Sequence, residues 1–234
     1  MVTQDELKHK AAYRAAEFVE SGMVIGLGTG STTEHAVKRI AERLKTGELT
    51  NIAGIPTSQR TATLARELGI PLVDFETHPK IHVTIDGADE VDPNLNLIKG
   101  GGGALLREKV VAQASRRNII IVDESKLVST LGTNWALPIE VIPFALHTET
   151  LFLAALGGDV ILRTNYDSTP FRTDQNNMIL DTNFGPMNDP QRLALRLNER
   201  AGIAEHGLFL DLANDVIVAS AEGIRHLKRT ARGD

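Results

Sequence analysis

The sequence concentrates acidic side chains directly after an apolar segment. Residues 81–85 read IHVTI, and four carboxylates follow within seven positions: Asp86, Asp89, Glu90 and Asp92. Like charges at this spacing repel one another, and a carboxylate at the edge of a hydrophobic core loses hydration energy. A solvated turn, a calcium loop or a catalytic loop can each explain such a group.

Small residues inside this acidic segment favour a ligand other than calcium. Gly87 and Ala88 separate Asp86 from Asp89, so a ligand can approach the backbone closely there. The EF-hand spacing D-x-[DN]-x-[DN]-G is not met, because the lone glycine precedes the second aspartate. An Asx-type turn with solvated acids remains the structural alternative.

A second candidate is a glycine-rich segment that carries hydroxyl side chains. Residues 26–33 read GLGTGSTT and lead from a predicted strand into a predicted helix. Glycines let backbone N–H groups approach an anion, and a helix N-terminus adds about half a positive charge. Thr29, Ser31 and Thr32 add hydroxyl donors, so the pattern is typical of a phosphate cradle. An ordinary strand–helix turn with a Ser or Thr cap also fits it.

The same segment lacks the pattern of a dinucleotide site. The spacing from Gly26 to Gly30 is G-x-G-x-G, whereas a dinucleotide fingerprint reads G-x-G-x-x-G. The second predicted strand also runs into Pro56 and Thr57 where an acid should bind the ribose. We therefore expect no nicotinamide cofactor.

The third candidate is a run of four glycines at residues 100–103, in the segment KGGGGALLREK. Glycine loses more backbone entropy on folding than any other residue, so close approach of a ligand is a good reason to keep such a run. Lys99 precedes the run, and Glu108 follows it near the start of a predicted helix. A solvated lysine and an acid placed to suit the helix dipole are the structural alternatives.

Composition and charge exclude several classes of protein. The 234 residues are 42% apolar and carry a formal charge of -5, which gives no reason to expect nucleic acid or an anionic membrane as a partner. No cysteine is present, so disulfides and thiolate chemistry are excluded. The N-terminus has no signal-peptide core, and no apolar run reaches the roughly 20 residues of a membrane span. A cytoplasmic protein is expected.

The histidines do not predict a metal site. His78 and His82 are four residues apart, but Pro79 lies between them in a stretch with strand character. Two histidines at this spacing meet one metal ion only on a helix face, and no HExxH motif occurs.

Hydrophobic periodicity predicts alternating strands and helices in the first half of the chain. Strands are predicted at 23–27, 51–55, 71–75, 81–85 and 118–122, and helices at 3–20, 32–44, 58–68 and 104–116. This alternation favours a parallel sheet with helices on both faces. Ligands bind such sheets beyond the carboxyl ends of the strands, where loops 28–32, 86–92 and 123–126 lie.

After about residue 132 the pattern changes to a small α+β arrangement. Strands are predicted at 138–143, 160–163, 178–182, 208–212 and 216–219, and helices at 148–156 and 189–200. Of these strands, 160–163 and 178–182 are predicted to pair antiparallel. The last two can close the small domain or return to the main sheet, and the main sheet is preferred. The predicted domains are 1–132 with 207–234, and 133–206.

Four motifs in order resemble those of type A ribose-5-phosphate isomerases: GLGTGST, DGADEVD, KGGGGALLREK and DESK. The likeness extends to LPIEVIP and GLFLDLANDVIV. It implies a Rossmann-like α/β domain with a small α+β (ferredoxin-like) domain, a homodimer or homotetramer, and no metal or organic cofactor. It also implies interconversion of ribose 5-phosphate and ribulose 5-phosphate.

The resemblance also implies roles for individual residues. Glu108 corresponds to the proton-transferring base, and Asp86, Asp89 and Lys99 correspond to residues at the reacting end of the sugar. The implied substrate-binding residues are Thr29, Gly30, Ser31, Thr32, Asp86, Gly87, Ala88, Asp89, Lys99, Gly100, Gly101, Gly102, Glu108 and Lys126.

This chemistry suits the residue types. One carboxylate can move a proton between C2 and C1 through an enediol, and a lysine can stabilise the charge that develops on oxygen. Either Asp86 or Asp89 can carry the hydroxyl proton and assist ring opening. The phosphate can bind at 28–32, or at Lys126 and the amides of 100–102.

Two other readings share the phosphate cradle. A sugar-phosphate sensor joined to a DNA-binding module needs a helix-turn-helix, for which the single helix before the first strand leaves no room. A sugar-phosphate deaminase or an acyl-CoA transferase of similar fold differs from an isomerase in its products.

Overall fold

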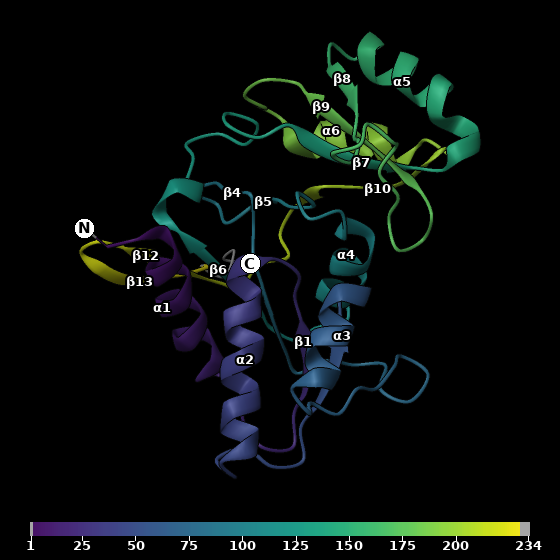
Figure 1. Cartoon of the computed structure of the whole chain (residues 1–234). Coiled ribbons are helices and arrows are strands. Elements are labelled where there is room, and N and C mark those ends of the chain that lie inside the picture. Colours follow the sequence, from purple (N-terminus) through teal and green to yellow (C-terminus); the bar gives the residue numbers. More distant parts are fainter. Residues whose placement is uncertain (1, 230–234) are drawn as a thin grey trace, which may run out of the picture. The chain divides into compact units, whose positions relative to one another are not determined.

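The computed structural model describes residues 2–229, and its contacts divide the chain into two compact units (Figure 1). The first unit holds the chain up to Ala88, Arg107–Lys126 and the chain from Asp211 on. The second holds Asp89–Leu106 and Leu127–Leu210.

A six-stranded sheet in the order β13-β12-β6-β3-β1-β2 forms the centre of the first unit. Its strands are β1 (Val24–Leu27), β2 (Ala53–Pro56), β3 (Val83–Asp86), β6 (Asn118–Asp123), β12 (Asp215–Ser220) and β13 (Gly223–Lys228). All neighbours are parallel except β12 and β13, which form an antiparallel hairpin at the edge. Every residue of β6 and β12 is buried, as expected for parallel strands covered on both faces.

Helices cover both faces of this sheet, as the sequence predicts. They are α1 (Gln4–Ala16), α2 (Ser31–Lys45), α3 (Gln59–Glu67) and α4 (Leu105–Gln113). Alternation along β1 explains the two layers, because Ile25 and Leu27 pack with α1 and α2 while Val24 packs with Val111 of α4. Helix α1 begins with a capping box, in which Thr3 and Glu6 bond to each other's backbone N–H groups.

The prediction of a full strand at residues 71–75 is wrong. Only Leu72 forms a β-bridge, to Gly54 at the edge of the sheet. Pro71 has no N–H group for a strand ladder. A turn already begins at Asp74, whose side chain accepts a hydrogen bond from the Thr77 N–H (3.1 Å).

The second unit contains a four-stranded antiparallel sheet in the order β10-β7-β9-β8. Its elements are β7 (Leu137–Val141), α5 (Leu146–Ala155), β8 (Asp159–Leu162), β9 (Met178–Asn183), α6 (Pro190–Asn198) and β10 (Ile203–His206), with the short 3₁₀ helix η2 (Pro143–Ala145) before α5. This β-α-β-β-α-β succession with strand order 4-1-3-2 is ferredoxin-like, as the resemblance implies. Strand β10 was not predicted.

A small three-stranded sheet also belongs to the second unit. It consists of β4 (Glu90–Val91), β5 (Leu97–Ile98) and β11 (Leu208–Phe209), in the order β11-β5-β4. The division of the chain therefore differs from the predicted boundaries at 132 and 207. The prediction that the last two strands return to the main sheet is correct for β12 only, because β11 pairs with β5. Strands of two residues are too short to show a hydrophobic period.

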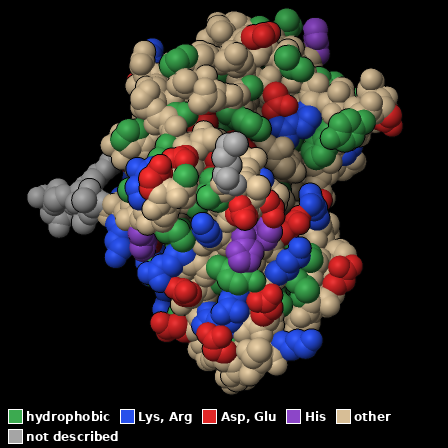
Figure 2. Space-filling model, turned by 60° about the vertical axis from the view of Figure 1, so that its left-hand side comes forward, with side chains coloured by type: hydrophobic (Ala, Val, Ile, Leu, Met, Phe, Trp, Pro, Cys, Tyr) green, Lys and Arg blue, Asp and Glu red, His purple; other side chains and the backbone are tan. Residues whose placement is uncertain are grey.

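Charged side chains of both signs lie side by side on the face drawn in Figure 2, without one continuous basic patch. Ion pairs such as Arg39–Glu42 on α2 (3.3 Å) join charges of opposite sign. Among the described residues, no helix has the length and apolar character needed to cross a membrane.

Candidate active site

Loops that follow β1, β3 and β6 gather at one edge of the first unit's sheet, because these strands run parallel. They are Gly28–Gly30, the turn at Gly87, and the 3₁₀ helix η1 (Glu124–Lys126). A backbone hydrogen bond from the Gly28 N–H to the Ile85 carbonyl (3.0 Å) joins the first two loops. The sequence-based expectation that candidate residues meet at the carboxyl ends of strands holds within this unit.

Asp86 is buried against the glycine loop. Its Oδ1 accepts hydrogen bonds from the backbone N–H groups of Thr29 (3.1 Å) and Gly87 (2.8 Å), which replace the water lost on burial. A Cβ atom at Gly28 would lie 2.3 Å from this oxygen. Glycine is therefore required at position 28 for the close approach of the two loops.

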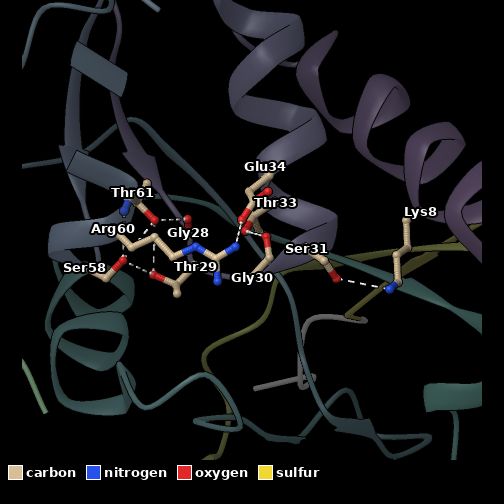
Figure 3. Close-up of polar contacts among 10 residues, drawn as sticks. All are labelled: Lys8, Gly28, Thr29, Gly30, Ser31, Thr33, Glu34, Ser58, Arg60 and Thr61. Atoms are coloured by element: carbon tan, nitrogen blue, oxygen red, sulfur yellow. Dashed lines mark hydrogen bonds and ion pairs between the residues drawn. The ribbon is translucent and has the colours of Figure 1, made fainter. Parts of the chain in front are cut away.

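The hydroxyl of Thr29 contacts protein groups (Figure 3). Its Oγ1 donates to Ser58 Oγ at 2.8 Å. It also lies 2.7 Å from Thr57 Oγ1, which the figure does not draw. Thr61 in the first turn of α3 donates to the Gly28 carbonyl (3.0 Å), and Ser58 caps the same helix. These hydroxyl groups fix the glycine loop to the start of α3.

The N-terminus of α2 has the features of an anion site. Gly30, the N-cap residue, has φ of 124° and no side chain that could cap the first N–H groups. Such groups, together with the helix dipole, attract negative charge. The Thr33 hydroxyl donates instead to the Gly30 carbonyl (2.8 Å), which stabilises the turn (Figure 3).

Lys8 adds a positive charge that sequence analysis missed. Its Nζ donates to Ser31 Oγ at 3.1 Å, so a side chain of α1 lies at the first residue of α2 (Figure 3). A signal for it exists in the sequence. Lys8 precedes the buried Ala11, Ala12 and Ala15 by three, four and seven positions, which places it on the buried face of α1.

The remaining candidates of the first unit are Glu108 and Lys126. Glu108 lies in the first turn of α4 and is only 3% exposed. Lys126 is half-buried at the end of η1, which follows β6. Since β6 is the neighbour of β3, Lys126 follows the strand next to the one that ends in Asp86.

Two of the four acids in the opening segment have structural roles in the second unit. Glu90 is buried and accepts backbone N–H groups from Gly132 (2.6 Å), Asn134 (2.5 Å) and Trp135 (2.8 Å). Asp92 accepts the N–H (2.7 Å) and side-chain amide (3.1 Å) of Asn96, four residues further on, and so closes a turn longer than the two-residue span of an Asx turn.

Asp89 instead contacts the glycine run. Its Oδ2 accepts the Gly101 N–H at 2.8 Å, and a Cβ atom at Gly101 would lie 2.6 Å from Asp89 Oδ1. The run turns tightly, because the Gly103 N–H donates to the Gly100 carbonyl (2.9 Å) and both residues have positive φ, +81° and +100°. L-residues rarely adopt this conformation, which explains two of the glycines.

Lys99 is buried directly before this turn, with 3% of its surface exposed. Its N–H donates to the Gly207 carbonyl (2.9 Å), and its Nζ lies 5.5 Å from the ring centroid of Phe209. The ring face attracts the ammonium group and limits its orientations. Within residues 2–229 no group of three or more His, Asp or Glu side chains is arranged to hold a metal ion.

Comparison with known proteins gives consistent matches over nearly the whole chain. The profile of the family described as Ribose 5-phosphate isomerase A (phosphoriboisomerase A) matches residues 53–223. Ribose-5-phosphate isomerase A of Desulfatibacillum aliphaticivorans is 59% identical over 97% of this chain and 99% of its own. The Chloroflexus aurantiacus protein of the same name is 57% identical, over 94% of this chain and 92% of its own.

Solved structures match equally well. A D-ribose-5-phosphate isomerase in complex with phospho-erythronic acid superposes with a TM-score of 0.95 at 43% identity, covering 97% of this chain and 100% of that one. Ribose 5-phosphate isomerase from Plasmodium falciparum gives 0.94 at 41% identity with the same coverage. The identities and the coverage together show that the chain belongs to the ribose 5-phosphate isomerase A family, whose members interconvert an aldose phosphate and a ketose phosphate.

Proposed function

We propose that the chain interconverts D-ribose 5-phosphate and D-ribulose 5-phosphate through an enediol, with Glu108 as the proton-transferring base. Membership of the isomerase family supports the reaction and the substrate pair. Glu108 is chosen as the base because it is buried in the first turn of α4, the helix that follows the glycine run. A helix N-terminus stabilises the carboxylate that a base requires.

Glu108 takes the proton from C2 of the open-chain aldose and returns it to C1 of the enediol. Both transfers use one face of the planar intermediate, so a single carboxylate is sufficient. The protonated carboxyl group of the first step is the acid of the second, and the base is regenerated after each turnover. General-base catalysis of this kind contributes about 10²- to 10⁴-fold.

Lys99 stabilises the negative charge that develops on the oxygens at C1 and C2. A fixed ammonium group is effective here because it needs no reorganisation as the charge appears. Asp86 and Asp89 hydrogen-bond the polyol and move its hydroxyl protons, and one of them assists opening of the furanose ring. Backbone N–H groups at Thr29, Gly87 and Gly101 support this role, because they hold the two carboxylates in fixed positions.

The phosphate group binds at the N-terminus of α2. Support comes from the uncapped first turn at Ser31 and Thr32 and from the ammonium group of Lys8 beside Ser31. Thr29 and Gly30 shape the loop that precedes this turn. Lys126 and the amides of Gly100–Gly102 are the alternative donors, and they contact the sugar hydroxyls if α2 holds the phosphate.

The reaction uses no metal ion or organic cofactor, because acid–base groups and a lysine are sufficient for it. The protein is a cytoplasmic homodimer or homotetramer, as the resemblance implies. The division into domains 1–132 with 207–234, and 133–206, stays a prediction.

The decisive experiment mixes purified protein with ribose 5-phosphate and follows the ketose. We expect ribulose 5-phosphate, uptake of solvent deuterium during turnover, and unchanged activity after treatment with a chelator. Release of ammonia from an amino sugar phosphate without ketose formation would indicate a deaminase. Ligand binding without turnover would indicate a sensor, and loss of activity on chelation that added metal restores would reveal a metal site.

A further inference from the structure

Arg163 of the second unit binds the glycine run from the side opposite to Asp89. It directly follows β8, and its Nη1 donates to the carbonyl oxygens of Gly100 (3.0 Å) and Gly101 (3.1 Å). Its Nε donates to Asp181 Oδ2 at 2.8 Å, and its Nη2 bonds to Asp181 Oδ1. One guanidinium group therefore joins the antiparallel sheet to the loop after Lys99.

The alternation of the sheet explains why Arg163 points toward this loop. Val160 and Leu162 of β8 pack in the core beneath the helices, whereas Ile161 faces the other way and is 63% exposed. The ladder continues to Arg163, whose N–H donates to the Ile179 carbonyl (2.9 Å). Arg163 is thus in phase with Ile161, on the face that also carries Asp181, the partner of Ile161 in β9.

Arg163 and Asp89 hold opposite ends of a single peptide group. The Gly100 carbonyl and the Gly101 N–H belong to the same peptide plane, which is trans, since the described residues contain no cis peptide. Arg163 binds the carbonyl end and Asp89 accepts the N–H end at 2.8 Å. A positive and a negative side chain therefore fix the orientation of this plane.

The next peptide plane is fixed in the same way. Arg163 also binds the Gly101 carbonyl, so the Gly102 N–H in that trans peptide points away from the guanidinium group. Gly102 is exposed, in contrast to the buried Lys99 and Gly103 around it. The arginine thereby directs one backbone donor outward from the loop.

A run of glycines needs such external contacts, because its own backbone has many accessible conformations. Phe171 supplies another. A Cβ atom at Gly103 would lie 2.4 Å from the Phe171 ring, and that ring lies 5.8 Å from the Arg163 guanidinium carbon. The Phe171 N–H also donates to the Arg163 carbonyl (2.9 Å), so one segment covers both ends of the run.

We propose that Arg163, anchored by Asp181, is a positioning residue for the isomerase. It holds the peptides of residues 100–102 so that the Gly102 N–H and the preceding Lys99 meet the substrate in a fixed geometry. Arg163 itself touches no reacting atom. The inference rests on the proposed function, which assigns Lys99 and residues 100–102 to the substrate.

The test compares Arg163→Met, Arg163→Lys and Asp181→Asn with a control, Arg172→Met. Arg172 lies in the same segment but is exposed, and its Nη1 donates to the Asn176 carbonyl (3.1 Å). For each variant, kcat, KM, the pH profile and the unfolding temperature are measured with ribose 5-phosphate. Isothermal titration with phospho-erythronic acid gives the Kd and the number of sites per chain.

Arg163→Met is expected to lose about 100-fold in kcat/KM, the size of effect that a displacement of about 1 Å at an active site produces. The Kd for the acid rises, one site per chain is retained, and the midpoints of the pH profile stay unchanged because Glu108 is intact. Arg163→Lys recovers part of the loss, since a lysine keeps the charge but not the planar fork. Asp181→Asn changes the same parameters in the same direction.

A double variant of Arg163→Met and Asp181→Asn is expected to be no worse than Arg163→Met alone, because the two side chains act through one contact. Wild-type KM and Kd in Arg163→Met, with only a lower unfolding temperature, would overturn the proposal. An equal loss in Arg172→Met would overturn it as well. If Arg163→Met does not fold, the same comparison of KM, Kd and unfolding temperature is made with Arg163→Lys and Asp181→Asn. Wild-type KM and Kd in both variants would then overturn the proposal. Absence of isomerisation by the wild-type protein would instead refute the proposed function.

Discussion

The four carboxylate side chains within residues 86–92 have different surroundings. Asp86 and Asp89 accept backbone N–H groups of glycine-rich loops, whereas Glu90 and Asp92 hold turns of the second unit. Repulsion among the four is reduced because each carboxylate has its own donors. Of the four, the proposed function assigns only the first two to the sugar.

Replacing Glu108 with glutamine tests the proposed base. The amide keeps the size of the side chain but cannot accept a proton from carbon, so turnover should fall by about three orders of magnitude with the fold retained. Deuterium exchange at C2 and circular dichroism are the measurements. Glu67→Gln, at an exposed position in α3, serves as the control. Turnover within about tenfold of wild type would remove Glu108 from this role.

Lys8→Met tests the proposed phosphate site. Loss of one charge-assisted hydrogen bond should raise KM for ribose 5-phosphate by about tenfold or more, while kcat changes little. The preference for ribose 5-phosphate over unphosphorylated ribose should decrease by the same factor. Lys38→Met, at an exposed position in α2, is the matched control. An unchanged preference would place the phosphate elsewhere, with Lys126 the next residue to test.

At the scale of elements, strand ends, loops and the first turns of helices carry the candidate residues, and neighbouring elements help to fix their positions. Glycines at the end of β1 allow the next loop to approach, and hydroxyl groups at the start of α3 hold the loop in place. The loop that carries Thr29 thus depends on contacts with the start of α3, which carries no candidate residue. In the second unit, Glu90 of β4 holds the turn at residues 132–135, which precedes β7.

Glu90→Gln should affect stability more than chemistry. Glu90 binds three backbone N–H groups from residues 132–135, and an amide offers one acceptor oxygen where the carboxylate offers two. We expect a loss of about 2 kcal/mol in the free energy of unfolding, with kcat of the folded protein near wild type. Urea unfolding and steady-state kinetics measure the two effects. A large fall in kcat at unchanged stability would give Glu90 a chemical role.

At the scale of the molecule, one buried acid should make stability depend on pH. Glu140 in β7 is fully buried, and burial raises its pKa above the ordinary value of 4.5, although bonds from Asn177 and Thr173 act in the opposite direction. Its cross-strand partner Glu205 raises the pKa further. Within residues 2–229, Glu140 Oε2 is buried without a hydrogen-bond partner, as suits a protonated carboxyl group.

The sign of the effect follows from proton binding. Between pH 4.5 and the raised pKa the folded chain binds more protons at Glu140 than the unfolded chain does, so stability falls as pH rises through this window. Glu140→Gln should remove this slope, and its stability relative to wild type should increase with pH. Urea unfolding from about pH 4.5 to 8 measures it, with Glu67→Gln as the control. Parallel pH curves for Glu140→Gln and wild type would contradict the prediction.

The sequence by itself determined the alternation of strands and helices, the gathering of three loops at the carboxyl ends of parallel strands, and the motifs that point to the isomerase family. These features depend on local periodicity, glycine and capping chemistry, which act over a few residues. The edge segment at 71–75 and the two-residue strands are too short for such local patterns to define them. The segment at 71–75 was therefore wrongly predicted as a full strand, and β4 and β5 were missed.

Only the tertiary structure decided which charged side chains support which loop. Glu90 finds its donors 42 to 45 positions away, Lys8 meets Ser31 across 23 positions, and Arg163 binds carbonyls 62 and 63 positions earlier in the chain. Such bonds form only after helices and strands have packed, because packing sets the distance between residues that are remote in sequence. Residue types and local spacing carry no information about that distance.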